Sequence, residues 1–141
     1  MPAIKSESGE STAAAGRKNP AAVFDLAALV RRSMNDRSLA AMLVEKFTAR
    51  LARSVEDIQQ MTAASDWHAA AAKIHTLKGE AGSLAAVHLH AAATRLEQCL
   101  RAGRYAEAPS HLSDVQGAAA ECLASAQAAL SQLAAGADIR S

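Results

Sequence analysis

Aromatic residues are nearly absent from this sequence, at 3% of its 141 residues. Glycine and proline are also few, with seven and three copies, and no stretch alternates apolar with polar residues as a half-buried strand does. Half of the residues are nevertheless hydrophobic, so a core must be built mainly from alanine, leucine and valine. Because alanine loses no side-chain entropy on becoming helical, this composition predicts an all-α protein.

A strong charge of either sign is missing as well. The 15 basic and 14 acidic residues give a net charge of +1, which provides no field for nucleic acid or an anionic membrane. The longest uncharged run, residues 122–137, is too short and too polar to cross a bilayer, which takes about 20 apolar residues. The start of the chain lacks the apolar core of a secretory signal. We therefore expect a cytoplasmic, monomeric protein without nucleic-acid partners or membrane insertion.

Metal ligands and disulfides are not expected either. The two cysteines, Cys99 and Cys122, fall at apolar positions of helical patterns, so we interpret them as reduced core residues. His88 and His90 do not share a helical face, and His111 has no visible partner. Because a structural zinc ion would take four ligands, we expect no metal site in this chain.

Composition divides the chain into three parts. Residues 1–21 are rich in Ser, Glu, Gly, Lys and Ala and have almost nothing to bury, which predicts a disordered tail or a linker from a preceding domain. Residues 22–135 carry the helical periodicity of one folded domain, and residues 136–141 are expected to form a flexible C-terminus.

Five helices are predicted from apolar residues that recur at three- and four-residue steps. Asp25 can cap a short first helix, which ends at Asn35-Asp36. The longer helices are expected at about residues 39–61, 67–86, 88–102 and 105–135, with Gly103 as a left-handed cap. Short connections between four long amphipathic helices predict an antiparallel up-down four-helix bundle, with the short N-terminal helix capping one end.

The helix predicted over residues 67–86 has one reactive side chain on its outer face. At about 100° per residue, its apolar positions form a core-facing arc, whereas His75 lies about 140° from the middle of that arc. Lys78 lies one turn away. The other neighbours of His75 on this face are small: Ala71, Ala72, Gly79 and Gly82. Because each glycine costs about 1 kcal/mol inside a helix, we interpret the two glycines as space for another molecule to approach closely.

His75 and Lys78 together suit phosphoryl chemistry. A neutral imidazole is a nucleophile near pH 7, because the ordinary pKa of histidine is about 6.5. A lysine one turn away supplies a cation to a phosphoryl group with about two negative charges. The sequence contains no glycine-rich phosphate loop, no acidic cluster for a metal, and no second base beside His75. It therefore predicts a residue that accepts and passes on a phosphoryl group while a partner supplies the remaining chemistry.

The run from His75 to Leu84, HTLKGEAGSL, closely resembles the signature of histidine-containing phosphotransfer (HPt) domains. Further matching landmarks extend the resemblance over about residues 22–133: Phe24-Asp25-Leu26, Ser65-Asp66-Trp67, Leu96-Glu97 and Ala102-Gly103. The resemblance implies a four-helix phosphorelay intermediate of bacterial two-component systems. In that family a histidine receives a phosphoryl group from the aspartate of one receiver domain and donates it to the aspartate of another.

The resemblance also implies roles for individual residues. His75 is the phosphoacceptor, Lys78 stabilises the charge of the phosphoryl group, and Glu97 is a candidate polar neighbour of His75, although an ordinary surface glutamate is the favoured reading. The surface that contacts a partner is expected to comprise His68, Ala71, Ala72, Gly79, Gly82 and Ala86. Two positions depart from the usual motif, with Glu80 in place of a small residue and Ala85 in place of a glycine.

Cofactors and partners follow from the same resemblance. The chain needs no cofactor of its own, because Mg²⁺ belongs to the receiver, and it has no ATP-dependent kinase activity. The expected partners are response-regulator receiver domains, a hybrid sensor kinase, or both. Residues 1–21 fit either a stand-alone shuttle or the C-terminal part of a hybrid histidine kinase.

Two other functions compete with this one. The first is a regulatory module that binds a protein through the same helix face without obligatory phosphotransfer. The second is an enzyme such as a phosphohistidine phosphatase or a kinase, which would require an ATP site or a water-activating base that the sequence lacks.

Overall fold

The structure, a computed structural model, describes residues 23–135. Within this range the chain is all-helical and contains no β-strand, which confirms the predicted all-α class. The elements are α3 (Leu26–Arg32), α4 (Arg37–Ala63), α5 (Trp67–Ser83), α6 (Val87–Arg101), the 3₁₀ turn η1 (Tyr105–Glu107) and α7 (Ala108–Ala135). The predicted tail of residues 1–21 and the predicted flexible end of residues 136–141 lie outside the described residues. Among the described helices, none is long and apolar enough to span a membrane.

Three of the helices begin at an aspartate that caps them. Asp25, Asp36 and Asp66 each accept a hydrogen bond from the backbone amide three residues later, at 3.0, 3.1 and 3.3 Å. Each carboxylate thereby satisfies one of the amides that a helix leaves unpaired at its N-terminus. These are the starts that the sequence predicted for the short helix at Asp25 and for the helix after Ser65-Asp66.

Two predicted helix boundaries are wrong for local reasons. Helix α5 ends at Ser83 and not at about Ala86, because Ala85 adopts a left-handed conformation with φ of 57°. The amide of Ala86 then donates to the carbonyl of Ala81 at 2.9 Å, which closes the helix end. The last helix begins at Ala108, after the 3₁₀ turn η1, and not at residue 105. Pro109 has no N–H to donate to the carbonyl of Tyr105, so an α-helix that began at residue 105 would lack that hydrogen bond, whereas one that begins at Ala108 places the proline in its first turn.

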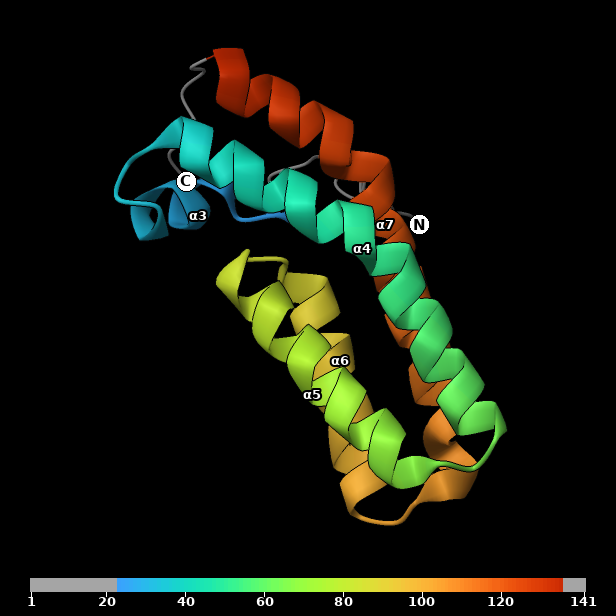
Figure 1. The fold of residues 1–141 in the computed structure, drawn as a ribbon. Helices are drawn as coiled ribbons and strands as arrows, with labels where there is room; N and C mark the ends of the chain where they lie inside the picture. Colours follow the sequence, from blue (N-terminus) through green and yellow to red (C-terminus); the bar gives the residue numbers. More distant parts are fainter. Residues whose placement is uncertain (1–22, 136–141) are drawn as a thin grey trace, which may run out of the picture.

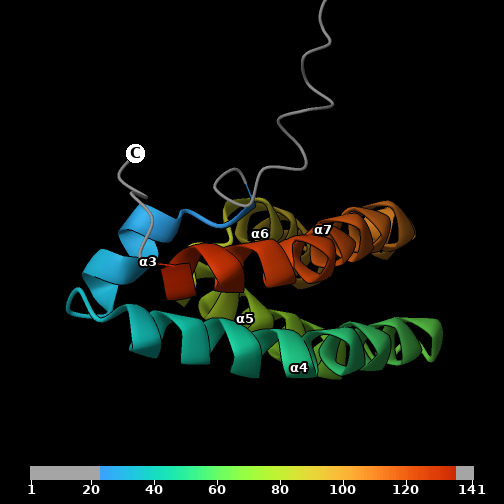
Figure 2. The ribbon, with the colours of Figure 1, turned by 90° about the horizontal axis from the view of Figure 1, so that it is seen from above.

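The four long helices pack around a core rich in alanine and leucine. Helix α4 contacts α5 and α7, and α6 contacts the same two helices, with the closest pairings between α5 and α6 and between α4 and α7 (Figures 1 and 2). Cys99 and Cys122 are free and buried in this core. Burial, reinforced by the neighbouring Glu121, raises the pKa of the Cys122 thiol to about 12.

The segment that leads into α3 is attached to the turn between α5 and α6. The amide of Asp25 donates to the carbonyl of Ala85 at 2.8 Å, and Phe24, which is fully buried, forms an isolated β-bridge with Ala86. The Arg32 guanidinium donates to the carbonyl of Gly82 at 2.6 Å. Helix α3 lies at the end of the molecule where α4 begins (Figures 1 and 2). These contacts hold the C-terminal end of α5, the helix that carries the candidate site.

Candidate functional site

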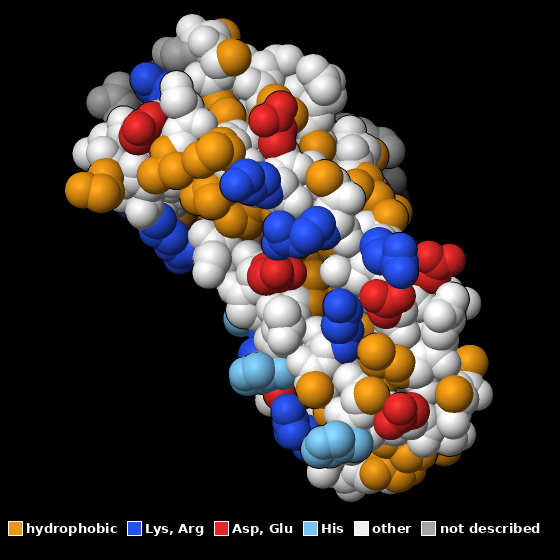
Figure 3. Space-filling view, in the orientation of Figure 1, with side chains coloured by type: hydrophobic (Ala, Val, Ile, Leu, Met, Phe, Trp, Pro, Cys, Tyr) orange, Lys and Arg blue, Asp and Glu red, His pale blue; other side chains and the backbone are white. Residues whose placement is uncertain are grey.

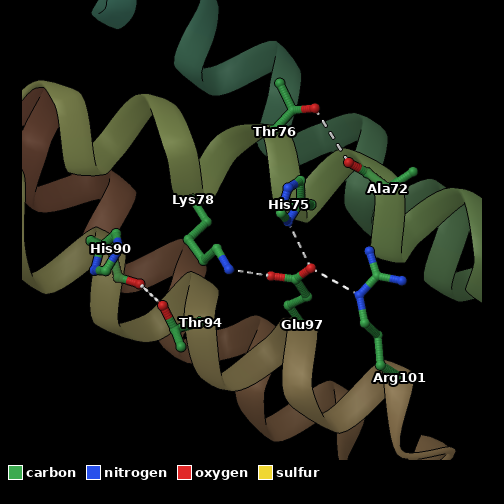
Figure 4. A network of polar contacts seen from close by, with 8 residues as sticks. All are labelled: Ala72, His75, Thr76, Lys78, His90, Thr94, Glu97 and Arg101. Atoms are coloured by element: carbon green, nitrogen blue, oxygen red, sulfur yellow. Dashed lines mark hydrogen bonds and ion pairs between the residues drawn. The ribbon is translucent and has the colours of Figure 1, made fainter.

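His75 projects from the middle of α5 into solvent. Its side chain is 62% exposed, whereas its neighbours Ile74 and Leu77 are buried in the core. The prediction that His75 lies on the outer face of this helix is therefore confirmed. The side chain is nevertheless hydrogen-bonded: Figure 4 shows it directed toward Glu97, a buried acidic residue of α6.

Glu97 on α6 is the residue that the His75 ring contacts. Its carboxylate is only 8% exposed and binds three side chains (Figure 4). His75 Nδ1 lies 2.8 Å from Oε2, Arg101 Nε lies 2.9 Å from the same oxygen, and Lys78 Nζ lies 2.8 Å from Oε1. The expectation that Glu97 is an ordinary surface glutamate is wrong, because the close packing of α5 on α6 covers it. Its place beside His75 agrees with the candidate role as a polar neighbour.

The charge state of Glu97 determines which imidazole nitrogen is available. Burial raises the pKa of this carboxyl, but the hydrogen bonds from Lys78, Arg101 and His75 outweigh burial and lower the pKa from 4.5 to about 2. Glu97 is therefore ionised near neutral pH and can only accept hydrogen bonds. It follows that Nδ1 of His75 carries a proton and donates a hydrogen bond to Glu97. In the neutral imidazole, the lone pair then resides on Nε2.

The sequence showed no second base beside His75, and the structure adds a carboxylate there. Glu97 is an acidic group beside His75, but its low pKa makes it a poor base and it contacts Nδ1 and not Nε2, so it orients the ring as a carboxylate orients a metal-binding or catalytic histidine. Arg101 was missed altogether. The signal was available, because Arg101 follows Glu97 by four residues and so shares its helical face.

Three residues of the expected partner surface are exposed. His68, Ala72 and Gly79 are exposed on α5. A Cβ atom added to Gly79 would meet nothing within 4 Å, so the surface beside His75 is open at this position. The glycine therefore leaves room in front of the histidine.

Three other residues of the expected surface are not accessible in that way. Ala71 is only 5% exposed and Ala86 only 1%, so neither presents a side chain to a partner. Ala71 lies at the edge of the core-facing arc, and Ala86 is covered through its bridge with Phe24. Gly82 is partly covered: a Cβ atom there would lie 3.1 Å from the ring of His90. The sequence prediction placed all three outward because it followed α5 alone, without its neighbours.

A groove between α4 and α5 opens beside His75. It encloses about 530 Å³ and is lined on its apolar side by Leu43, Phe47 and Leu84. Its basic side is formed by α4 residues Lys46 and Arg50, and Figure 3 shows basic side chains gathered along this helix next to an apolar patch. Arg50 also pairs with Glu80 at 3.0 Å, which explains how a charged residue is accommodated where the motif usually has a small one.

The remaining histidines form no metal centre among the described residues. No group of three His, Cys, Asp or Glu side chains comes close enough to hold an ion in that part of the chain. His88 instead pairs with Glu121 on α7 at 3.2 Å, and His90 packs against Gly82.

Comparison with known proteins identifies the family. A family model described as "Hpt domain" matches residues 42–136, which is more than half of the chain and includes α5 and α6 with His75, Lys78 and Glu97. No curated protein and no solved structure matches the chain. The chain therefore belongs to the Hpt domain family, whose members are phosphocarrier modules for histidine phosphotransfer in two-component systems.

Proposed function

We propose that His75 accepts a phosphoryl group from the aspartate of one receiver domain and passes it to the aspartate of another. One observation carries this proposal: the buried, ionised Glu97 binds Nδ1 at 2.8 Å while the His75 side chain is 62% exposed. The imidazole is thus held through Nδ1 while most of its ring is exposed to solvent. A carrier that must meet large partners requires this exposure.

The transfer is a displacement at phosphorus. The Nε2 lone pair forms the N–P bond as the P–O bond to the receiver aspartate breaks, and the aspartate leaves as a carboxylate. The proton on Nδ1 stays hydrogen-bonded to Glu97. In the onward step a carboxylate oxygen of the second receiver aspartate forms a new P–O bond as the N–P bond breaks, and the electron pair of the N–P bond returns to Nε2. Because Nδ1 keeps its proton, the imidazole departs as a neutral group, which makes the phosphohistidine a competent donor.

Lys78 supplies positive charge at this site. Its ammonium group lies 2.8 Å from Glu97 and its side chain is 28% exposed, so it is partly accessible from the side of His75. An ammonium has three N–H donors, of which Glu97 uses one, and the others can contact phosphoryl oxygens. We infer that Lys78 stabilises the charge of the phosphoryl group in this way.

The partner completes the reaction. We propose that the receiver supplies Mg²⁺ and its own aspartate, that the chain acts as a monomer, and that it has no kinase activity toward ATP. The docking face is inferred to include His68, Ala72 and Gly79, together with the groove whose basic side holds Lys46 and Arg50. This charge suits a receiver with an acidic rim.

The arrangement of the helices fits such a module. We infer an antiparallel up-down four-helix bundle in which α3 caps one end. Its support is the short connections at residues 64–66, 84–86 and 102–104, together with the mutual contacts of α4, α5, α6 and α7. In this bundle the site faces outward from the α5–α6 pair, and a receiver can dock without entering the core.

The proposal is tested by mixing the chain with a receiver labelled through a small phosphodonor. We expect label on the original chain and on His88→Gln, an exposed histidine that pairs with Glu121 away from the site, but none on His75→Gln. Equal labelling of His75→Gln would overturn the assignment. If a receiver binds the chain but no label moves to it, the protein is a binding module and not a carrier. Labelling by ATP alone would instead indicate a kinase.

A further inference from the structure

We propose that Arg101, on α6, is a second cation that binds the phosphoryl group on His75. This inference rests on the proposed function of His75. The sequence motif contains a single cation near the histidine, Lys78, and it assigns no role to Arg101. The structure brings it to the site through its contact with Glu97.

The position of Arg101 follows from a shared oxygen. Arg101 Nε and His75 Nδ1 both bond Oε2 of Glu97, at 2.9 and 2.8 Å. The two nitrogens therefore lie within two hydrogen-bond lengths of each other. Figure 4 shows the rest of the guanidinium extending from Glu97 toward α5, on the side where the His75 ring stands.

The donors of Arg101 are largely uncommitted. A guanidinium carries five N–H groups in a planar fork, and within residues 23–135 that of Arg101 makes one hydrogen bond, through Nε. Its side chain is 54% exposed, against 28% for Lys78. The two terminal nitrogens can therefore bind two phosphoryl oxygens at once while Nε stays on Glu97. Bidentate contact of this kind is the geometry in which arginine binds phosphate best.

The charge balance at the site favours a second cation on this chain. Glu97 is one anion and contacts two permanent cations, Lys78 and Arg101. Without Arg101, the ammonium and the carboxylate would cancel and leave nothing to offset a phosphoryl group of about two negative charges. With Arg101, one positive charge is in excess before phosphorylation.

No other described cation is placed to supply that charge. On the α4 side of His75, Arg50 is paired with Glu80, and Lys73 is paired with Asp57 at 3.8 Å. Lys46 lies across the groove on α4. Arg101 shares an oxygen with His75, and this direct link makes it the stronger candidate.

The experiment compares Arg101→Gln and Arg101→Lys with Arg95→Gln. Arg95 is a matched control because it is an exposed arginine of the same helix that lines a different groove, with His88 and Glu121. Each chain is equilibrated with a phosphorylated receiver, and the ratio of phosphohistidine to phosphoaspartate is measured. We expect Arg101→Gln to lower this ratio by about tenfold, Arg101→Lys to lower it less, and Arg95→Gln to leave it unchanged.

A second measurement separates binding of the phosphoryl group from a structural effect. A cation in contact with the phosphoryl oxygens favours their charged form, so the phosphoryl pKa, followed by ³¹P NMR, should rise in Arg101→Gln and not in Arg95→Gln. An unchanged ratio and an unchanged phosphoryl pKa in Arg101→Gln would overturn the inference, as would a lowered ratio without any change in that pKa. Absence of label on the original chain would instead contradict the proposed function itself.

Discussion

Glu97 is a single side chain that organises the whole site. It is a buried carboxylate, which would be costly alone, yet it accepts hydrogen bonds from His75, Lys78 and Arg101. Because three donors converge on it, the orientation of the imidazole and the positions of both cations depend on one residue. A substitution at Glu97 should therefore change both the chemistry of His75 and the stability of the fold.

The acid dependence of stability measures the part played by Glu97. The pKa of Glu97 is about 2 in the folded chain and 4.5 ordinarily. Its contribution to stability is therefore complete above about pH 4.5 and is lost as the pH falls through about 2. Glu97→Gln should lower the free energy of unfolding by about 1 to 3 kcal/mol at neutral pH. Denaturant titrations should show this deficit narrowing between pH 4.5 and pH 2. A deficit that is the same at all these pH values would show that the charge of Glu97 is not responsible.

Ala85 gives a prediction about backbone strain. It has a φ of 57°, where a side chain costs roughly 1 to 2 kcal/mol and glycine costs nothing, but its methyl group is buried and contributes about 0.8 kcal/mol. Ala85→Gly should therefore raise the free energy of unfolding by only about 0.5 kcal/mol. Met34, also left-handed at 57° but 87% exposed, provides the comparison.

Met34→Gly should stabilise the chain more than Ala85→Gly, because it relieves the same strain and gives up no burial. Both values are measured by denaturant unfolding. If Ala85→Gly lowers stability while Met34→Gly raises it, packing of the methyl group outweighs the backbone strain at Ala85. The departure from the usual glycine at residue 85 would then be a favourable replacement.

At the scale of the helix, α5 gives up stability to leave space in front of His75. Glycine inside a helix is about 1 kcal/mol less favourable than alanine. A Cβ atom at Gly79 would meet nothing within 4 Å, so packing within the described chain does not require this glycine. At Gly82 the same atom would approach the ring of His90 to 3.1 Å, so this glycine also serves the packing of α6 on α5.

The two glycines should respond differently to substitution. Gly79→Ala should raise the free energy of unfolding by about 1 kcal/mol, and Gly82→Ala should raise it less, because His90 has to shift. Gly79→Leu should fold normally, and a small phosphodonor should still phosphorylate its His75. A receiver, however, should transfer little phosphoryl group to this variant. Transfer to Gly79→Leu at the original rate would show that the docking face does not include Gly79.

The limits of prediction from the sequence also appear at the scale of helices. Capping aspartates and three- and four-residue periodicity are local signals, so they predicted where α3 and α5 begin and that His75 faces outward. The environment of Glu97 and the burial of Ala71 depend on how α5 and α6 are rotated about their axes when they pack. A helical wheel drawn for one helix does not contain that rotation, so these features could not be predicted.

At the scale of the molecule, the all-helical class followed from composition, and the motif around His75 identified the family. The assembly adds what no single helix provides. Packing of α6 against α5 brings a carboxylate to one side of the histidine, and the contacts of α4 with α5 form a groove with basic residues on the other side. A receiver that docks here would meet an imidazole already oriented and a surface already charged.

The central claim, that Glu97 holds Nδ1 so that the phosphoryl group is carried on the other nitrogen of His75, can be tested on the phosphorylated chain. The chain is labelled with ¹⁵N, phosphorylated by a receiver, and its imidazole ¹⁵N–³¹P couplings are measured by NMR. We predict a phosphoryl group on Nε2 of His75, with Nδ1 still protonated and hydrogen-bonded. A phosphoryl group on Nδ1, or on any other residue, would contradict the account.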